Sequence, residues 1–235
     1  GVRMNLTLTE SDGTTTKLNE PGPLLNDDLI EELAALVVAE AAGAQWVVLS
    51  GSLPPGVPSD FYATLVRRLR PLGVKVAVDT SDEPLQALVD NFPEAAPDLL
   101  KPNSEELAQL TGADAEQLEA AAKAGDPSAA VAASRSLVER GVAAVMGTLG
   151  ASGAVLVTSE GSWHASPPPI VPRSTVGAGD SSVAGYVLAD CGGEAAPDRL
   201  RTAVAYGSAA ASMAGSALPR PEHLNIADVV ITDLG

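Results

Sequence analysis

The amino-acid sequence predicts an α/β fold in which helices cover both faces of a mostly parallel β-sheet. Short apolar runs of the kind found in buried strands alternate with longer segments of helical periodicity. Turn residues separate the two kinds of segment. Because parallel strands need crossover connections, this alternation is typical of βαβ units.

The composition fits one large domain or two small ones. The chain has 235 residues, of which 46% are hydrophobic and 3% aromatic, so the core is built mainly from Ala, Val and Leu. A net charge of −16 argues against nucleic-acid binding, and no apolar run has the length of a membrane helix. One cysteine and two histidines exclude a disulfide framework and a metal-ligand cluster, which favours a reducing, cytoplasmic location.

The elements follow in order along the chain. Residues 2–18 read as a β-hairpin with one apolar face and a turn at 11–13, and nothing nearby in sequence covers that face. We then expect strands at 46–49, 74–79, 98–100 and 143–146, and an antiparallel pair at 154–158 and 163–164. We expect helices at 26–42, 59–72, 84–89, 104–111, 128–140, 179–188 and 198–213, a short helical piece near 221–229, and an Ala-rich helical hairpin at 113–133.

Ligands of open α/β sheets bind beyond the carboxyl ends of the strands. Four loops occupy that position here: 50–56, 101–106, 148–153 and the stretch around 177–180. The sequence has no Walker A pattern and no G-x-G-x-x-G after its first βαβ strand, so the dinucleotide interpretation is weak.

The glycine turn at Gly177-Ala178-Gly179 leads directly into a predicted helix, with Asp180 at the junction. Backbone N–H groups of such a turn and the free N–H groups of a helix start attract a phosphate. Asp180 has two interpretations. It caps the helix, or it is a general base beside an anion-binding turn.

The other loops also leave alternatives open. Asn103 and Glu106 have capping-box spacing, and they also suit a hydrated Mg²⁺ beside nucleotide phosphates. Lys101 is either a phosphate contact or a surface lysine. The loop from Thr148 through Gly150 to Gly153 is either a hairpin turn or a nucleotide loop.

Taken together, these motifs resemble the ribokinase-like (PfkB) family of carbohydrate kinases. The resemblance rests on four motifs in family order: S-T-V-G-A-G-D at 174–180, N-x-x-E at 103–106, T-L-G-x-x-G at 148–153 and S-G-S-L-P-x-G at 50–56. Val176, the Arg3-x-Asn5 strand and the segment 20–23 look like the 1-phosphofructokinase branch, with features shared by tagatose-6-phosphate kinases.

The resemblance implies a three-layer α/β/α sandwich with a small β lid. Residues 1–20 would form a partial hairpin lid, and residues 21–235 the ribokinase-like core. It also implies an ATP-dependent kinase that converts D-fructose 1-phosphate to fructose 1,6-bisphosphate with Mg²⁺, and a homodimer through the lid. Two alternatives remain: a tagatose-6-phosphate kinase or other PfkB sugar kinase, and a catalytically incomplete fragment that only binds nucleotide.

The resemblance assigns each candidate residue a role. Asp180 would be the catalytic base, and the amides of Gly177, Ala178 and Gly179 would hold the transferring phosphoryl group. Asn103 and Glu106 would organise the Mg²⁺ water network. ATP would contact Thr148, Gly150, Gly153, Lys101 and Gly207, the last beside the adenine, and Arg3 would grip the phosphate already on the sugar.

The sequence also departs from the family pattern. Family members begin with a strand, an Asn-Pro segment and a Gly-Gly motif that holds the sugar, and none of these lies in the 235 residues. Gly147 stands where a β-branched strand residue is expected. We therefore expect much of the sugar site to lie upstream of Gly1.

Overall fold

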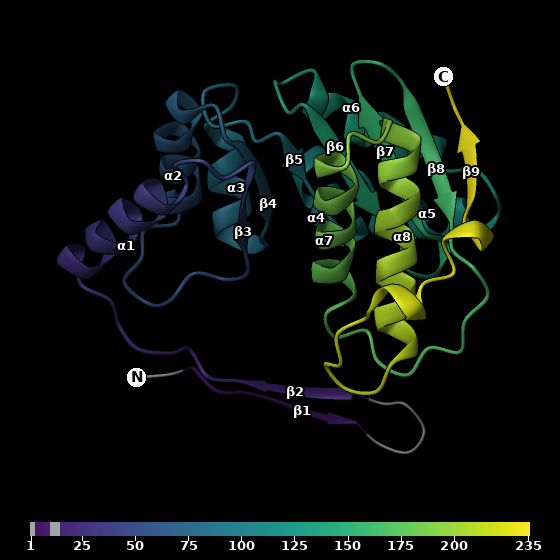
Figure 1. Ribbon diagram of the computed structural model, residues 1–235, viewed down its shortest axis with the longest axis horizontal. Helices are drawn as coiled ribbons and strands as arrows, with labels where there is room; N and C mark the ends of the chain where they lie inside the picture. Colours follow the sequence, from purple (N-terminus) through teal and green to yellow (C-terminus); the bar gives the residue numbers. More distant parts are fainter. Residues whose placement is uncertain (1–2, 10–14) are drawn as a thin grey trace.

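The computed structural model describes residues 3–9 and 15–235, which form two separate β-sheets (Figure 1). The smaller sheet is the antiparallel hairpin of β1 (Asn5–Thr9) and β2 (Thr15–Asn19). In Figure 1 it lies apart from the helices and the large sheet, near the N-terminus. The turn predicted at 11–13 lies outside the described residues.

The larger sheet has seven strands within the described residues, in the order β3-β4-β5-β6-β7-β8-β9. Strands β3 to β6 are parallel neighbours, whereas the pairs from β6 to β9 are antiparallel, so only β7 and β9 run against the rest. The strands are β3 (Trp46–Ser50), β4 (Lys75–Asp79), β5 (Leu99–Leu100), β6 (Ala144–Thr148), β7 (Ala154–Thr158), β8 (Ser162–Ser166) and β9 (Val230–Asp233).

Helices cover both faces of this sheet, as the sequence predicts. In Figure 1, α7 and α8 lie in front of the sheet, and the earlier helices pack on its other face. The helices are α1 (Asp27–Glu40), α2 (Phe61–Leu69), α3 (Asp82–Asp90), α4 (Ser104–Thr111), α5 (Ala115–Lys123), α6 (Ser128–Val138), α7 (Ala178–Cys191) and α8 (Ala196–Ser212). Among the described helices, none is both long and apolar enough to cross a membrane.

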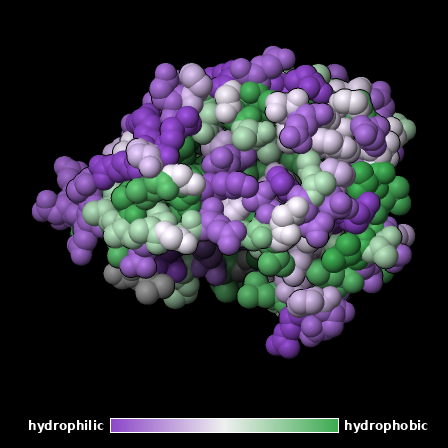
Figure 2. Space-filling model, turned by 45° about the horizontal axis from the view of Figure 1, so that its top comes forward, coloured by the Kyte–Doolittle hydropathy of each residue, from purple (hydrophilic) through white to green (hydrophobic). Residues whose placement is uncertain are grey.

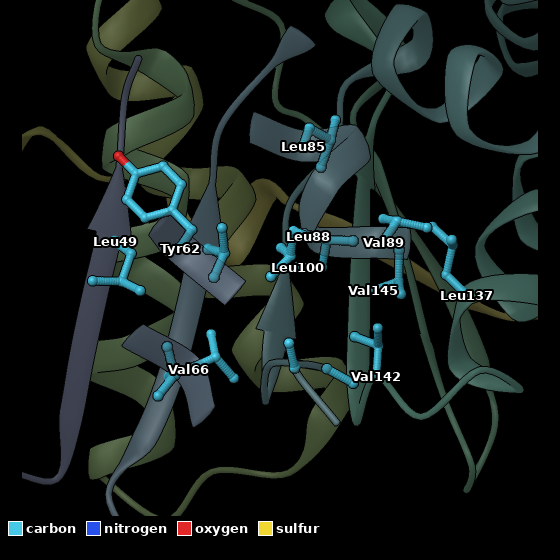
Figure 3. Close-up of a cluster of buried hydrophobic side chains, with 14 of the residues drawn as sticks. Leu49, Tyr62, Val66, Leu85, Leu88, Val89, Leu100, Leu137, Val142 and Val145 are labelled. Carbon is cyan, nitrogen blue, oxygen red and sulfur yellow. The ribbon is translucent and has the colours of Figure 1, made fainter. Parts of the chain in front are cut away.

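Side-chain alternation along the strands divides the core into two clusters. Val76 and Val78 of β4 join the cluster beneath α1 to α6, whereas Ala77 between them joins the cluster beneath α7 and α8. Figure 3 shows part of the first cluster, where Leu100 and Val145 of neighbouring strands meet leucines and valines of the covering helices. A strand that contributes to both clusters must be apolar throughout, which explains the continuous apolar runs.

The C-terminal region differs from the sequence prediction. Residues 221–229 form two short 3-10 helices, η3 (Pro221–His223) and η4 (Ile226–Asp228), rather than one helical piece. The chain then adds β9 to the sheet edge, a strand that the sequence analysis missed. The strand is short and mostly exposed, so it lacks the apolar run that marks the other strands.

Strand β3 forms the opposite edge of the large sheet. It is apolar, yet Val48 is 46% exposed, and Leu33 and Leu36 of the adjacent helix α1 are also exposed. Figure 2 shows hydrophobic side chains gathered on the side of the molecule where α1 lies. An open apolar edge of this kind presents backbone groups that can pair with a further strand.

Candidate active site

The carboxyl ends of the four parallel strands meet at one edge of the sheet. Ser50 at the end of β3 is in register with Asp79 at the end of β4. An isolated parallel bridge between Asn103 and Thr148 joins the chain just beyond β5 to the end of β6. The loops that the sequence analysis singled out therefore lie side by side, as parallel-strand geometry requires.

The start of α7 meets the same edge. Gly177 is the N-cap, with φ 76, and the helix begins at Ala178. Asp180 is in the first turn, and no side chain caps this helix, so the capping interpretation of Asp180 is wrong. Its exposed carboxylate instead accepts a hydrogen bond of 3.3 Å from the hydroxyl of Ser50. The Asp180 carboxylate is therefore not needed to cap α7, and its oxygens are accessible to a ligand.

The glycine turn combines two sources of positive potential. The Ala178 N–H makes only a long hydrogen bond, 3.4 Å to the Thr175 carbonyl, and the first N–H groups of a helix have no intrahelical acceptor. Lys101 lies directly below, because a Cβ built on Gly179 would be 3.4 Å from the Lys101 Nζ. The arrangement suits an anion held over the turn.

Lys101 is buried, not a surface lysine. Its side chain is 7% exposed, and its Nζ forms an ion pair of 3.0 Å with Asp79 Oδ1. Burial raises the pKa of the Asp79 carboxyl, the Lys101 charge opposes that rise, and the nearby charge of Asp180 adds to it. The ion pair with Asp79 offsets part of the free-energy cost of burying the Lys101 side chain.

Asn103 and Glu106 form the capping box that their spacing predicts. The Asn103 side chain accepts from the Glu106 N–H at 2.8 Å, and Glu106 Oε2 accepts from the Asn103 N–H at 2.9 Å. Burial raises the pKa of the Glu106 carboxyl, against the opposing effects of the Asn103 N–H and Lys101. The cap holds this half-buried carboxylate at the strand-end edge.

The loop after β6 is a 3-10 turn, η2 (Gly150–Ser152), closed by a 2.8 Å hydrogen bond from the Leu149 N–H to the Gly153 carbonyl. Gly153 has φ +91, and a Cβ there would lie 1.9 Å from the Ala165 carbonyl oxygen of β8. Only glycine fits this close approach. The backbone of the loop therefore sits directly on β8.

Gly207 lies in the middle of α8 and packs against α7. A Cβ at this position would be 2.3 Å from Ser182 Oγ and 3.2 Å from the Ala178 carbonyl oxygen. The structure therefore gives Gly207 a packing role between the two helices, close to the start of α7. Its assignment as an adenine neighbour remains a prediction.

Arg3 reaches the strand-end edge from the hairpin segment. Its Nη1 donates to Ser52 Oγ at 2.7 Å, and its Nε donates to the Glu20 carbonyl at 2.7 Å. The guanidinium is thus held against the loop that follows β3, although it is exposed. A held guanidinium at a site edge suits phosphate oxygens.

Sequence reasoning missed two site residues. Asp79 ends a predicted strand, but only the fold reveals its ion pair with Lys101. The second is Asp82, whose negative charge helps to raise the pKa of the Glu106 carboxyl; it is also the one non-glycine residue with positive φ among the described residues, at 56. The position of an acidic residue at the end of a buried strand was the signal available for Asp79.

The acidic groups at this edge do not make a preformed metal cage. Within residues 3–9 and 15–235, no group of three or more His, Cys, Asp or Glu side chains is arranged to hold a metal ion. Mg²⁺ usually keeps several waters and takes one or two carboxylates together with substrate phosphates. The half-buried Glu106 and the ion-paired Asp79 fit that mode of binding.

The seven-stranded sheet between helical layers, with this edge as its candidate site, defines a ribokinase-like α/β fold. The family model for pfkB family carbohydrate kinases matches residues 2–223, and the chain belongs to this family. Both the predicted family and the predicted fold are thereby confirmed.

Two curated relatives are 1-phosphofructokinases. The one from Xanthomonas campestris pv. campestris is 37% identical over 80% of this chain and 57% of its own length. The one from Rhodobacter capsulatus is 38% identical over 89% of this chain and 62% of its own length. The chain therefore spans less than two thirds of these relatives.

A solved structure shows the same fold. Phosphofructokinase-2 from Escherichia coli, in complex with substrates and products, superimposes with a TM-score of 0.80 at 32% sequence identity. The match covers 93% of this chain and 67% of that enzyme.

Proposed function

We propose that the protein containing this chain is an ATP-dependent sugar-phosphate kinase whose substrate is D-fructose 1-phosphate and whose product is fructose 1,6-bisphosphate. The observation that carries the proposal is the exposed carboxylate of Asp180 at the start of α7, beside the glycine turn and above the buried Lys101. The 1-phosphofructokinase relatives support the choice of sugar phosphate.

In the proposed reaction, Asp180 takes the proton from the attacking sugar hydroxyl. The hydroxyl oxygen forms a bond to the γ-phosphorus as the bond to the ADP oxygen breaks. The amides of Gly177, Ala178 and Gly179 and the ammonium of Lys101 face the charge on the transferring phosphoryl group. Catalysis of this kind depends mainly on positioning and charge stabilisation.

Thr148, Gly150 and Gly153 would line the ATP site in the loop that closes on β8, with Gly207 near the adenine. Asn103 and Glu106, with Asp79 close by, would hold the hydrated Mg²⁺ that accompanies ATP. Bound there, Mg²⁺ would neutralise phosphate charge during transfer. Arg3, held by Ser52, would bind the phosphate already present on the sugar.

The first test is Asp180→Asn in the complete gene product that contains residues 1–235. Loss of a general base costs about 10²–10⁴-fold in rate, so we expect kcat to fall by that order while the affinity for ATP barely changes. Asp198→Asn is a matched control, since Asp198 is also in the first turn of its helix but lies on α8. Near wild-type turnover by Asp180→Asn would overturn the assignment.

The substrate is tested by comparing kcat/KM for fructose 1-phosphate, fructose 6-phosphate and tagatose 6-phosphate. We expect fructose 1-phosphate to be preferred. Preference for tagatose 6-phosphate would favour the second candidate, which shares the features around Arg3 and residues 20–23. Nucleotide binding without any sugar-dependent turnover would favour a protein that only binds nucleotide.

We also propose that the hairpin is part of a lid through which two copies associate. Met4, Leu6, Leu8 and Leu18 are all about half exposed or more. Leu6 and Leu18 are directly opposite in the register, so their side chains share one face. Replacing Leu6 and Leu18 by Ser should convert a dimer to a monomer in light scattering. An unchanged mass would place the contact elsewhere.

A further inference from the structure

His164 contacts the loop after β6 from the neighbouring part of the sheet. It lies in the middle of β8 and is 8% exposed. Its Nε2 is 2.8 Å from the Ser152 carbonyl oxygen, in η2. A carbonyl oxygen only accepts hydrogen bonds, so Nε2 carries the hydrogen and donates it.

This hydrogen bond complements the close packing of the next residue of the loop, Gly153. The loop backbone at Gly153 already lies against the Ala165 carbonyl, the next residue of β8. The His164 side chain therefore fixes a second point, the carbonyl of Ser152, one residue before the close approach. Two successive loop residues are thus held by two successive residues of one strand.

We propose that His164 is a positioning residue for ATP: by holding the Ser152 carbonyl, it keeps the loop from Thr148 to Gly153 in the conformation that receives the nucleotide. The proposal rests on the proposed function, which places ATP at this loop. His164 lies under the loop in a buried position and acts through the loop backbone. Both the neutral and the protonated ring can donate from Nε2, so the contact does not depend on the charge of the ring.

The test compares His164→Leu, which fills similar space without a donor, with His164→Gln, whose amide N–H has similar reach. In the complete gene product, calorimetry with a non-hydrolysable ATP analogue and Mg²⁺ gives the affinity, and steady-state kinetics gives the two KM values. We expect His164→Leu to weaken nucleotide binding and raise the KM for ATP by roughly fivefold to tenfold, about the effect of one hydrogen bond. The KM for the sugar phosphate should stay within about twofold, and His164→Gln should recover most of the affinity.

His223→Leu is the matched control, because the other histidine of the chain is exposed and its Nδ1 accepts from the nearby Arg220 N–H. If His164→Leu does not fold, His164→Asn keeps polarity without the reach and takes its place against His164→Gln. Unchanged ATP affinity in the donor-less variant, or equal rises in both KM values, would overturn the role of His164. Failure of the wild-type protein to bind the analogue would instead overturn the proposed function, and this inference with it.

Discussion

At the scale of single residues, three carboxylates at one sheet edge differ in the interactions that they make within the protein. Asp79 pairs with Lys101, and Glu106 closes a capping box. Among the described residues, Asp180 has only the long hydrogen bond from Ser50. Asp180 makes the fewest interactions of the three, so its oxygens remain accessible to a substrate hydroxyl. It is therefore the best candidate for the proton acceptor.

A single substitution of Glu106 separates its role in the capping box from its proposed role in Mg²⁺ binding. Glu106→Gln keeps a side-chain acceptor for the Asn103 N–H, so the cap persists, but it removes the charge that burial disfavours. We expect the variant to be at least as stable as wild type at pH 7 and to lose activity that an increase in Mg²⁺ only partly restores. A loss of stability that matches the loss of activity would favour a purely structural role.

The raised pKa of Glu106 also determines how its contribution to stability changes with pH. The pKa of Glu106 is raised in the folded state, so folded protein binds more protons than unfolded protein in the window just above the usual carboxyl pKa. The contribution of Glu106 to stability is therefore full at acid pH and lost as the pH rises through that window. Urea unfolding of wild type and Glu106→Gln across pH 4–7 should show the two stabilities diverging in favour of the variant. Parallel curves would contradict this.

Gly147 illustrates a departure from the family pattern that packing explains. A Cβ at this position would be 3.2 Å from both Ser134 Oγ and Val155 Cγ2. Ser134 is fully buried, and its hydroxyl has no hydrogen-bond partner among the described residues. The serine thus occupies space that a larger strand residue would need.

This arrangement predicts coupled effects on the free energy of unfolding. Ser134→Ala removes an unsatisfied buried hydroxyl and should stabilise the protein by about 1 kcal/mol. Gly147→Ala crowds the site and should destabilise it by about 1–3 kcal/mol. In the double variant we expect a smaller loss than the sum, because the clash with Oγ is gone. Strict additivity in a denaturant-based mutant cycle would show that the two positions do not share this space.

These residues also mark the limit of sequence reasoning at the site. The motif residues Asn103, Thr148 and Gly177 were identifiable because each lies in a short local pattern that follows or precedes a regular element. The Asp79–Lys101 pair and the Ser134–Gly147 contact join segments that are distant in sequence. Such pairings depend on strand order, which local periodicity does not encode.

At the scale of elements, the loop after β6 contains two glycines with different requirements. Gly150 has φ +55, and the nearest atom to an added Cβ is 4.0 Å away, whereas at Gly153 the Ala165 carbonyl would be 1.9 Å away. We expect Gly150→Ala to cost about 1–2 kcal/mol for its left-handed backbone alone. Gly153→Ala should cost clearly more and should lower ATP affinity as the loop lifts off β8. Equal losses in thermal unfolding would contradict the close packing.

The elements were predictable to the degree that their own residues carry the signal. The four parallel strands, the pair after β6 and the main helices follow from apolar runs and helical periodicity. Strand β9 could not be predicted in this way. Its four residues are mostly exposed, and they form a strand only because they pair with β8. The packing of Gly207 against Ser182 of α7 was likewise not predictable from the residues of α8 alone.

At the scale of the whole molecule, the two ends of the parallel strands carry different kinds of charged groups. The proposed chemistry lies at the carboxyl ends of β3 to β6. At the amino ends, the buried Asp190 of α7 accepts from Trp46 Nε1 at 2.8 Å and pairs with Lys75 at 2.7 Å and Arg199 at 2.9 Å. A cavity of about 440 Å³ lies beside this cluster, away from the candidate site. Three of the charged side chains that line it, Lys75, Asp190 and Arg199, are paired with one another, so we interpret this cluster as structural.

Because the Asp190 cluster lies away from the candidate site, a substitution of Asp190 should change stability without changing the proposed activity. Burial alone would raise the pKa of Asp190, but the bonds from Lys75 and Trp46 hold that pKa below its usual value. Its stabilisation is therefore present at neutral pH and lost as the pH falls through the lowered folded pKa. Asp190→Asn should cost about 1–3 kcal/mol at pH 7, less than a fully buried pair because Lys75 is half exposed and can rehydrate.

The same variant should keep both KM values and kcat near wild type at temperatures where it is folded, because no atom of the cluster reaches the carboxyl edge. The loss of stability relative to wild type should shrink on acidification, since both proteins then lack the charge. Asp90→Asn, at the exposed end of α3, serves as the control and should change neither quantity. A change in the KM for ATP in folded Asp190→Asn would show instead that α7 transmits strain along its length from Asp190 to Asp180.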